Sequence, residues 1–198
     1  MNFSNRIRLL ELVKARYTNG RFILGLDGLS RSGKSTLAKS LSELLNEIDY
    51  KVITFHIDDY IVKRKLRYGT GFDEWYEYYN LQWDVDYLRE NLFARLRTEN
   101  KITLPYYQND LDEMEIRTKL IPQECIVIIE GVFLQREQWR SLFDLMVYLD
   151  CPREERFERE SLETQGKIEK FKSRYWKAEE YYSNKICPVI SADIVIDS

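Results

Sequence analysis

Cysteine and histidine are scarce in this 198-residue chain, which contains three cysteines and one histidine. Cys125, Cys151 and Cys187 are too few and too widely spaced to predict a disulfide framework or a Cys/His metal site. Each lies in or beside an apolar run, so we expect buried, reduced thiols. The single histidine, His56, lies inside another apolar run, and we interpret it as structural rather than catalytic.

Long apolar runs and an excess of positive charge are also missing. No apolar run approaches the roughly 18 residues of a membrane span, and residues 1–17 lack the apolar centre and cleavage site of a signal peptide. We therefore expect a cytoplasmic protein without a membrane partner. The formal net charge of −3 argues against a dedicated nucleic-acid binder, because phosphate contacts need a concentrated basic surface. The length and the apolar fraction of 44% predict one domain over residues 1–198.

The most informative stretch is a glycine-containing loop between an apolar run and an amphipathic segment. Residues 28–35 read G-x-x-x-x-G-K-S, after the apolar run 22–27 and before leucines at helical spacing. In this strand–loop–helix context the pattern predicts a P-loop, whose backbone N–H groups and helix N-terminus surround a phosphate. We expect Lys34 to reach the β- and γ-phosphates of ATP and the Ser35 hydroxyl to coordinate Mg²⁺. The predicted nucleotide-binding residues of the loop are Gly28, Ser30, Ser32, Gly33, Lys34, Ser35 and Thr36.

Apolar, strand-like runs alternate with helical segments along most of the chain. The runs cover residues 22–27, 51–57, 125–131, 144–150 and 193–197. This alternation predicts an α/β fold with a parallel sheet flanked by helices, which binds its ligands beyond the carboxyl ends of the strands. The stretch of about 60–83 lacks periodicity and is predicted to be an irregular, substrate-side loop. The charge-dense stretch of about 152–174 is predicted to be a helical lid.

Acidic residues follow three of the predicted strands, at Asp27, Asp58-Asp59 and Glu130. In a parallel sheet these strand ends would converge on the edge that holds the P-loop. Phosphoryl transfer needs charge neutralisation and a nucleophile relieved of its proton. We expect Asp58 to be the base for an acceptor hydroxyl and to hold Mg²⁺ through water, with Glu130 near the metal at the position of a Walker-B acid. The alternative for both sites is a solvated turn after a strand.

Arginines recur at a spacing of three residues in the predicted lid. Arg153, Arg156 and Arg159 lie near one face of a helix. They could close over the ATP phosphates and stabilise the charge of the transition state. The alternative is a solvated face paired with the neighbouring glutamates. The aromatic run at 72–83 has two interpretations as well, a platform for a flat acceptor such as a nucleobase or a small core under a loop.

In their order along the chain, these motifs resemble the uridine kinase and phosphoribulokinase family of P-loop kinases. The matching elements are the P-loop, the acid-plus-aromatic stretch 58–60, the proline-containing strand 102–107, the stretch 128–132 and the start of the lid at 149–159. The resemblance implies a nucleoside-monophosphate-kinase-like P-loop NTPase fold with a five-stranded parallel core. It also implies an enzyme that uses ATP and Mg²⁺ to phosphorylate a hydroxyl of a small metabolite.

The resemblance also assigns roles to individual residues. Asp58 matches the catalytic acid, Glu130 the strand-end acid, Lys34 and Ser35 the phosphate and Mg²⁺ ligands, and Arg159 a lid arginine. We expect Asp58, Lys34 and Arg159 to be catalytic, Arg156 to bind the nucleotide, and Ser35, Asp58 and Glu130 to form the metal site. The expected acceptor-side residues are Asp59, Tyr60, Tyr107 and Glu130. The chain lacks the Asn-Phe-Asp-His-Pro element and the Arg-Asp and Arg-Gly pairs of uridine kinases. A nucleoside is the expected acceptor, and pantothenate, nicotinamide riboside or a sugar acid are alternatives. Two further possibilities stay open, a homo-oligomer and a nucleotide-binding regulatory protein without an acceptor.

Overall fold

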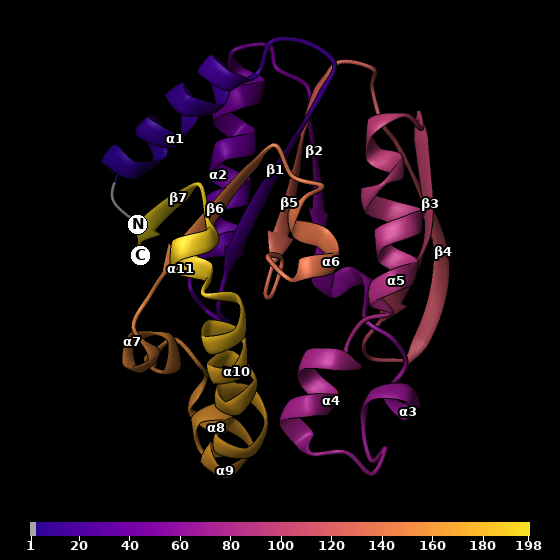
Figure 1. Cartoon of the computed structure of the whole chain (residues 1–198), viewed down its shortest axis with the longest axis vertical. Helices are drawn as coiled ribbons and strands as arrows, with labels where there is room; N and C mark the ends of the chain where they lie inside the picture. Colours follow the sequence, from indigo (N-terminus) through magenta and orange to yellow (C-terminus); the bar gives the residue numbers. More distant parts are fainter. Residues whose placement is uncertain (1–2) are drawn as a thin grey trace.

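A five-stranded parallel sheet lies at the centre of the computed structural model, which describes residues 3–198 (Figure 1). The strand order is β2-β5-β1-β6-β7, and every neighbouring pair is parallel. The strands are β1 (Arg21–Gly28), β2 (Val52–His56), β5 (Cys125–Gly131), β6 (Leu145–Asp150) and β7 (Ile194–Asp197). The predicted P-loop fold with five parallel strands is therefore confirmed.

The two faces of the sheet are both covered, which explains why β5 reads as an uninterrupted apolar run. Every residue of β5 is buried. Ile126 and Ile128 belong to one core cluster, whereas Val127 and Ile129 belong to the other, because successive side chains of a strand point to opposite faces. Helices α1 (Phe3–Arg16) and α2 (Lys34–Glu47) contribute leucines to the first cluster and lie together on one side of the sheet (Figure 1).

The second face is covered by an irregular helical stretch and by a β-hairpin. This stretch comprises α5 (Val85–Leu88), a π-helical turn (Arg89–Phe93) and a 3₁₀ turn (Arg95–Arg97), and α6 (Glu137–Arg140) packs beside it. The hairpin consists of β3 (Lys101–Gln108) and β4 (Glu113–Leu120), which pair antiparallel outside the main sheet. Within residues 3–198 there is no helix long and apolar enough to cross a bilayer.

The stretch predicted as an irregular loop is partly helical. It contains α3 (Arg64–Arg67) and α4 (Glu74–Asn80). The stretch predicted as a lid comprises α7 (Arg153–Glu158), α8 (Leu162–Gln165), α9 (Ile168–Lys170) and a π-helical turn (Phe171–Tyr175), followed by α10 (Trp176–Ile186) and α11 (Pro188–Ser191). A buried ion pair joins the two stretches, because Arg174 Nη1 lies 3.1 Å from Glu77 Oε2. Helix α4 also packs against the π-helical turn Phe171–Tyr175, and this contact fixes its position.

Candidate active site

The P-loop lies between the end of β1 at Gly28 and the start of α2 at Lys34. Gly28 and Gly33 have φ angles of 155° and 95°, in a region that favours glycine. A Cβ atom on Gly28 would lie 2.6 Å from Ser32 Oγ and 2.8 Å from the carbonyl oxygen of Leu149. The close approach of these groups explains why the first position of the motif requires glycine.

Lys34 is the buried cation of this loop. Its Nζ donates a hydrogen bond of 2.8 Å to the carbonyl oxygen of Leu29. Burial lowers the pKa of Lys34, and the carboxylates of Glu130, Asp27 and Asp58 oppose this effect. A buried ammonium group is stabilised by a nearby anion. The negative charge of a phosphate bound in the loop would therefore stabilise the positive charge of Lys34.

Glu130 connects β5 to the P-loop and to β2. Ser35 Oγ donates a hydrogen bond of 2.9 Å to Glu130 Oε1, and His56 Nδ1 lies 2.6 Å from the same oxygen. The strand register aligns His56 with Glu130. Burial raises the pKa of Glu130, but His56, Lys34 and Ser35 together lower it below its ordinary value. Glu130 is therefore a carboxylate at neutral pH.

The oxygen atoms of Ser35, Glu130 and Asp58 fit a magnesium ion. Mg²⁺ prefers oxygen ligands, keeps several waters and binds through one or two carboxylates together with substrate phosphates. In the described part of the chain, no cluster of three or more His, Cys, Asp or Glu residues is arranged as a metal cage.

Asp58 lies on a 3₁₀ turn (Ile57–Tyr60) that directly follows β2, and its carboxyl opens onto the cavity beside the P-loop. Crowding by surrounding protein atoms raises the pKa of Asp58, and the negative charges of Glu130 and Asp59 raise it further. The positive charge of Lys34 has the opposite effect. A carboxylate with a raised pKa is a better proton acceptor than an ordinary aspartate.

One cavity of about 1110 Å³ contains most of the predicted site residues. Those that line it are Ser30, Gly33, Lys34, Ser35, Thr36, Asp58, Glu130, Arg156 and Arg159. The predicted residues Gly28, Ser32, Asp59, Tyr60 and Tyr107 do not line it. Lining residues that sequence reasoning missed include Arg6, Tyr78, Val132 and Tyr175. Val132 lies in the matching stretch 128–132 and Tyr78 in the aromatic run 72–83, but neither was singled out. Arg6 and Tyr175 reach the cavity only through tertiary packing.

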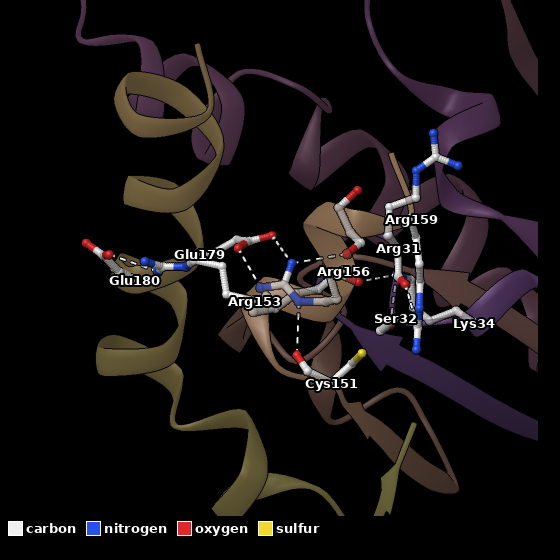
Figure 2. A network of polar contacts seen from close by, with 11 residues as sticks. Arg31, Ser32, Lys34, Cys151, Arg153, Arg156, Arg159, Glu179 and Glu180 are labelled. Carbon is white, nitrogen blue, oxygen red and sulfur yellow. Dashed lines mark hydrogen bonds and ion pairs between the residues drawn. The ribbon is translucent and has the colours of Figure 1, made fainter. Parts of the chain in front are cut away.

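Arg156 is a buried side chain that joins the lid to the P-loop. Its guanidinium forms a bidentate pair with Glu179, at 2.8 and 3.0 Å, as Figure 2 shows. The same guanidinium donates to the carbonyl oxygens of Ser30, at 3.1 Å, and of Cys151, at 3.0 Å. Its positive charge is thus matched by a buried carboxylate, and its geometry fixes the P-loop backbone.

The other two arginines of the predicted row are more exposed. Arg159 Nη1 donates a hydrogen bond of 2.9 Å to the carbonyl oxygen of Arg31 (Figure 2). Arg31 itself forms an ion pair of 2.9 Å with Glu160. Arg153 also lines the cavity and pairs with Glu180 at 2.9 Å. Of the three arginines, Arg156 is therefore buried, whereas Arg153 and Arg159 remain accessible to a ligand.

Tyr107 is directed away from the cavity. Its hydroxyl donates a hydrogen bond of 2.9 Å to Asp112 Oδ1 and accepts one of 3.1 Å from Arg67 Nη2. Tyr107 is also buried, at 4% exposure. In this conformation the hydroxyl is engaged in fixing the hairpin against α3.

The expected convergence of three strand-end acids is only partly correct, because Asp27 does not line the cavity. Its carboxylate is fully buried and accepts hydrogen bonds from the Tyr182 hydroxyl at 2.5 Å, Gln135 Nε2 at 3.0 Å and the Leu134 backbone N–H at 3.2 Å. Burial raises its pKa, and these hydrogen bonds partly offset that effect. Asp27 therefore anchors α10 to β1, and the cavity receives the carboxyls of Asp58 and Glu130 instead.

Comparisons with known proteins agree with this geometry. A family model described as an AAA domain matches residues 24–180. The uridine kinase of Borrelia duttonii is 30% identical over 141 residues, which cover 68% of this chain and 63% of that protein. The uridine kinase of Limosilactobacillus reuteri is 26% identical over 132 residues, which cover 65% of this chain and 58% of that protein. The chain thus spans less than two thirds of the length of these curated relatives.

Solved structures extend the match to the whole chain. A structure described as a possible uridine kinase from Bacillus stearothermophilus is 46% identical, with a TM-score of 0.88 over 100% of both chains. A D-glycerate 3-kinase from Cryptococcus neoformans covers 92% of this chain and 84% of its own, with a TM-score of 0.58 at 12% identity, and shares the fold alone. The P-loop, the two strand-end carboxylates and the match to these relatives lead to one conclusion. The chain belongs to the uridine kinase and phosphoribulokinase family of P-loop small-molecule kinases.

Proposed function

We propose that this kinase transfers the γ-phosphate of ATP to a hydroxyl of a small metabolite, with a nucleoside as the acceptor and Mg²⁺ as the metal. One observation carries the proposal. Lys34, Asp58 and the hydrogen-bonded pair Ser35–Glu130 face the same cavity. This set supplies a cation for the phosphates, a base for the acceptor and oxygen ligands for a metal, which are the three requirements of phosphoryl transfer.

In the proposed reaction, the acceptor oxygen attacks the γ-phosphorus, and the bond between that phosphorus and the leaving oxygen of ADP breaks. Asp58 accepts the proton of the attacking hydroxyl. Lys34 and the backbone N–H groups of the P-loop orient the phosphates, and Arg159 stabilises the negative charge from the lid. Ser35 and Glu130 would hold Mg²⁺, which neutralises charge on the β- and γ-phosphates when bound.

The proposed acceptor side lies between the stretches 60–83 and 152–174, with the second acting as a lid. Tyr78 and Tyr175 line the cavity there, and their ring centroids lie 4.9 Å apart. Aromatic faces of this kind suit a flat ring such as a nucleobase. The names of the curated relatives, uridine kinase, support the same acceptor. Pantothenate, nicotinamide riboside and sugar acids are the alternatives.

The proposal is tested by measuring ADP release from Mg-ATP with a panel of nucleosides, pantothenate, nicotinamide riboside and sugar acids. We expect uridine or another nucleoside to stimulate ADP release well above the rate without acceptor. Stimulation by one of the other compounds alone would keep the kinase and replace the acceptor. No stimulation across the panel, together with tight ATP binding, would favour a nucleotide-binding regulatory protein.

A further inference from the structure

The cavity extends past the P-loop to the first helix of the chain, where Arg6 forms part of its lining. We propose that Arg6 binds the nucleoside part of the nucleotide, as a residue of the nucleotide site contributed by α1. The proposal rests on nucleotide binding by the P-loop, as described above. It assigns a ligand role to a helix that precedes the P-loop motif.

The contact between Arg6 and α2 fixes the guanidinium along the nucleotide site. Arg6 Nη1 donates a hydrogen bond of 3.2 Å to Ser40 Oγ. Ser40 follows Thr36 by four residues on α2, so the two side chains share one helix face, about 6 Å apart along the axis. Thr36 and Ser40 both line the cavity. The Arg6 guanidinium therefore contacts α2 one helical turn beyond Thr36.

The strand order shows which end of the nucleotide would meet Arg6. Asp58 and Glu130 follow β2 and β5, on one side of β1, so the transferred phosphate and the acceptor belong to that side. The neighbour of Arg6, Asn5, contacts the opposite edge of the sheet, because its Nδ2 lies 3.5 Å from the carbonyl oxygen of Asp197 at the end of β7. Figure 1 shows the start of α1 beside β7, far from β2. A nucleoside on the side of β1 away from Asp58 and Glu130 would lie on the same side as the start of α1 and Arg6.

The chemistry of arginine suits this place. A guanidinium group stacks on the face of a base and donates hydrogen bonds to ribose or base oxygen and nitrogen atoms. Arg6 is half-buried and forms part of the cavity lining, so its side chain borders the space that the nucleoside would enter. The phosphates are held by Lys34 and the start of α2, and Arg6 would add affinity for the nucleoside alone.

Titration calorimetry without any acceptor tests this assignment by comparing ADP with inorganic tripolyphosphate, which lacks the nucleoside. We expect Arg6→Ala to weaken ADP binding about fivefold, which corresponds to about 1 kcal/mol, and to leave tripolyphosphate binding unchanged. Arg6→Lys should recover only part of the loss, because an ammonium group stacks less well. Arg8→Ala, on the same helix but exposed and outside this cavity, is the matched control and should bind ADP like the wild type.

Two results would overturn the inference. One is an unchanged ADP affinity in Arg6→Ala, and the other is an equal loss for ADP and tripolyphosphate, which would indicate a general charge effect. Thermal unfolding of each variant checks that the helix still packs, and Arg6→Lys provides the comparison if Arg6→Ala unfolds. If the wild type itself fails to bind ADP, the proposed nucleotide-dependent function fails, which is a different outcome from a failure of Arg6 alone.

Discussion

Ser35 donates a hydrogen bond of 2.9 Å to Glu130, which connects the first turn of the P-loop helix to the end of the buried strand β5. The two residues are 95 positions apart in sequence. Their contact places a hydroxyl and a carboxylate at one edge of the cavity, next to the position expected for the β- and γ-phosphates. The following predictions concern this site and the contacts that hold it.

Replacing Glu130 by glutamine should weaken the use of Mg²⁺. Glutamine keeps the size of the side chain and can still accept the hydrogen bond from Ser35, but it removes the negative charge near the metal. Residues that orient metal ligands typically contribute 10- to 100-fold, so we expect a loss of about that size in activity at low Mg²⁺. Turnover measured over a range of Mg²⁺ concentrations checks this, and an unchanged Mg²⁺ dependence would remove Glu130 from the metal site.

The single histidine reports on Glu130 directly. The hydrogen bond and charge of Glu130 raise the pKa of His56, while burial partly lowers it. An NMR titration should therefore give His56 a pKa above the ordinary value of about 6.5. In Glu130→Gln the pKa should fall toward that value. A pKa at or below the ordinary value in the wild type would contradict the contact.

The raised pKa of His56 also makes the free energy of unfolding depend on pH. Because the folded-state pKa is raised, the contribution of His56 is complete below its unfolded pKa and is lost as pH rises through the folded pKa. His56 is 44% exposed at the side chain, so solvent screening keeps the effect below about 1 kcal/mol. Urea unfolding on both sides of this range should show the decrease in the wild type but not in Glu130→Gln.

The hydroxyl of Tyr182 is predicted to stabilise the folded state. It donates to the buried carboxylate of Asp27 and accepts from the backbone N–H of Gln135, at 2.5 and 3.0 Å. Tyr182→Phe leaves both groups without this partner and should lower the free energy of unfolding by about 2 kcal/mol. The neighbour Tyr181 is 38% exposed, and Tyr181→Phe is the matched control with little expected effect. Equal stability of the two variants would contradict the account.

The ion pair between Glu77 and Arg174 should hold α4 against the lid. The two side chains are only 4% and 1% exposed. Glu77→Gln leaves the Arg174 charge without its carboxylate partner, so we expect a loss of about 3 kcal/mol in chemical denaturation. Glu163→Gln breaks an exposed pair with Lys167 and should change stability by less than about 0.5 kcal/mol. Similar losses of unfolding free energy in Glu77→Gln and Glu163→Gln would show that burial of the first pair does not increase its contribution to stability.

The pH dependence of this pair has the opposite sign to that of His56. Burial raises the pKa of Glu77, but hydrogen bonds from Thr70 and Arg174 outweigh it and lower the pKa below the ordinary value. The stabilisation is therefore present above the unfolded pKa of about 4.3 and is lost as pH falls through the folded pKa. Acid unfolding of Glu77→Gln should show a weaker dependence on pH in this range.

Local patterns predicted the parts of the site that lie on single elements. The P-loop requires glycines at fixed spacing, and β5 is apolar at every position until Glu130, so both were recognisable in the sequence. The strand-end position of Asp58 could also be predicted, because it directly follows the apolar run of β2.

Contacts between distant elements could not be predicted in the same way. Arg156 and Glu179 are separated by 23 residues, and their pairing depends on how the lid helices fold back. The sequence of α4 does not indicate a helix, because its seven residues combine acidic and aromatic side chains without an apolar period. Asp27 looked equivalent to Asp58 in the sequence, yet its carboxylate is enclosed by Tyr182 and Gln135, which come from later parts of the chain.

The role of Asp58 as the base is tested most directly by comparing turnover and nucleotide affinity in Asp58→Asn. The account predicts that kcat with the best acceptor falls by at least about 100-fold, the lower range for general base catalysis, while the dissociation constant for ADP changes little. Asp59→Asn, at a position that does not line the cavity, provides the neighbouring comparison. Near-normal turnover in Asp58→Asn would contradict the central claim that this carboxylate accepts the proton of the acceptor hydroxyl.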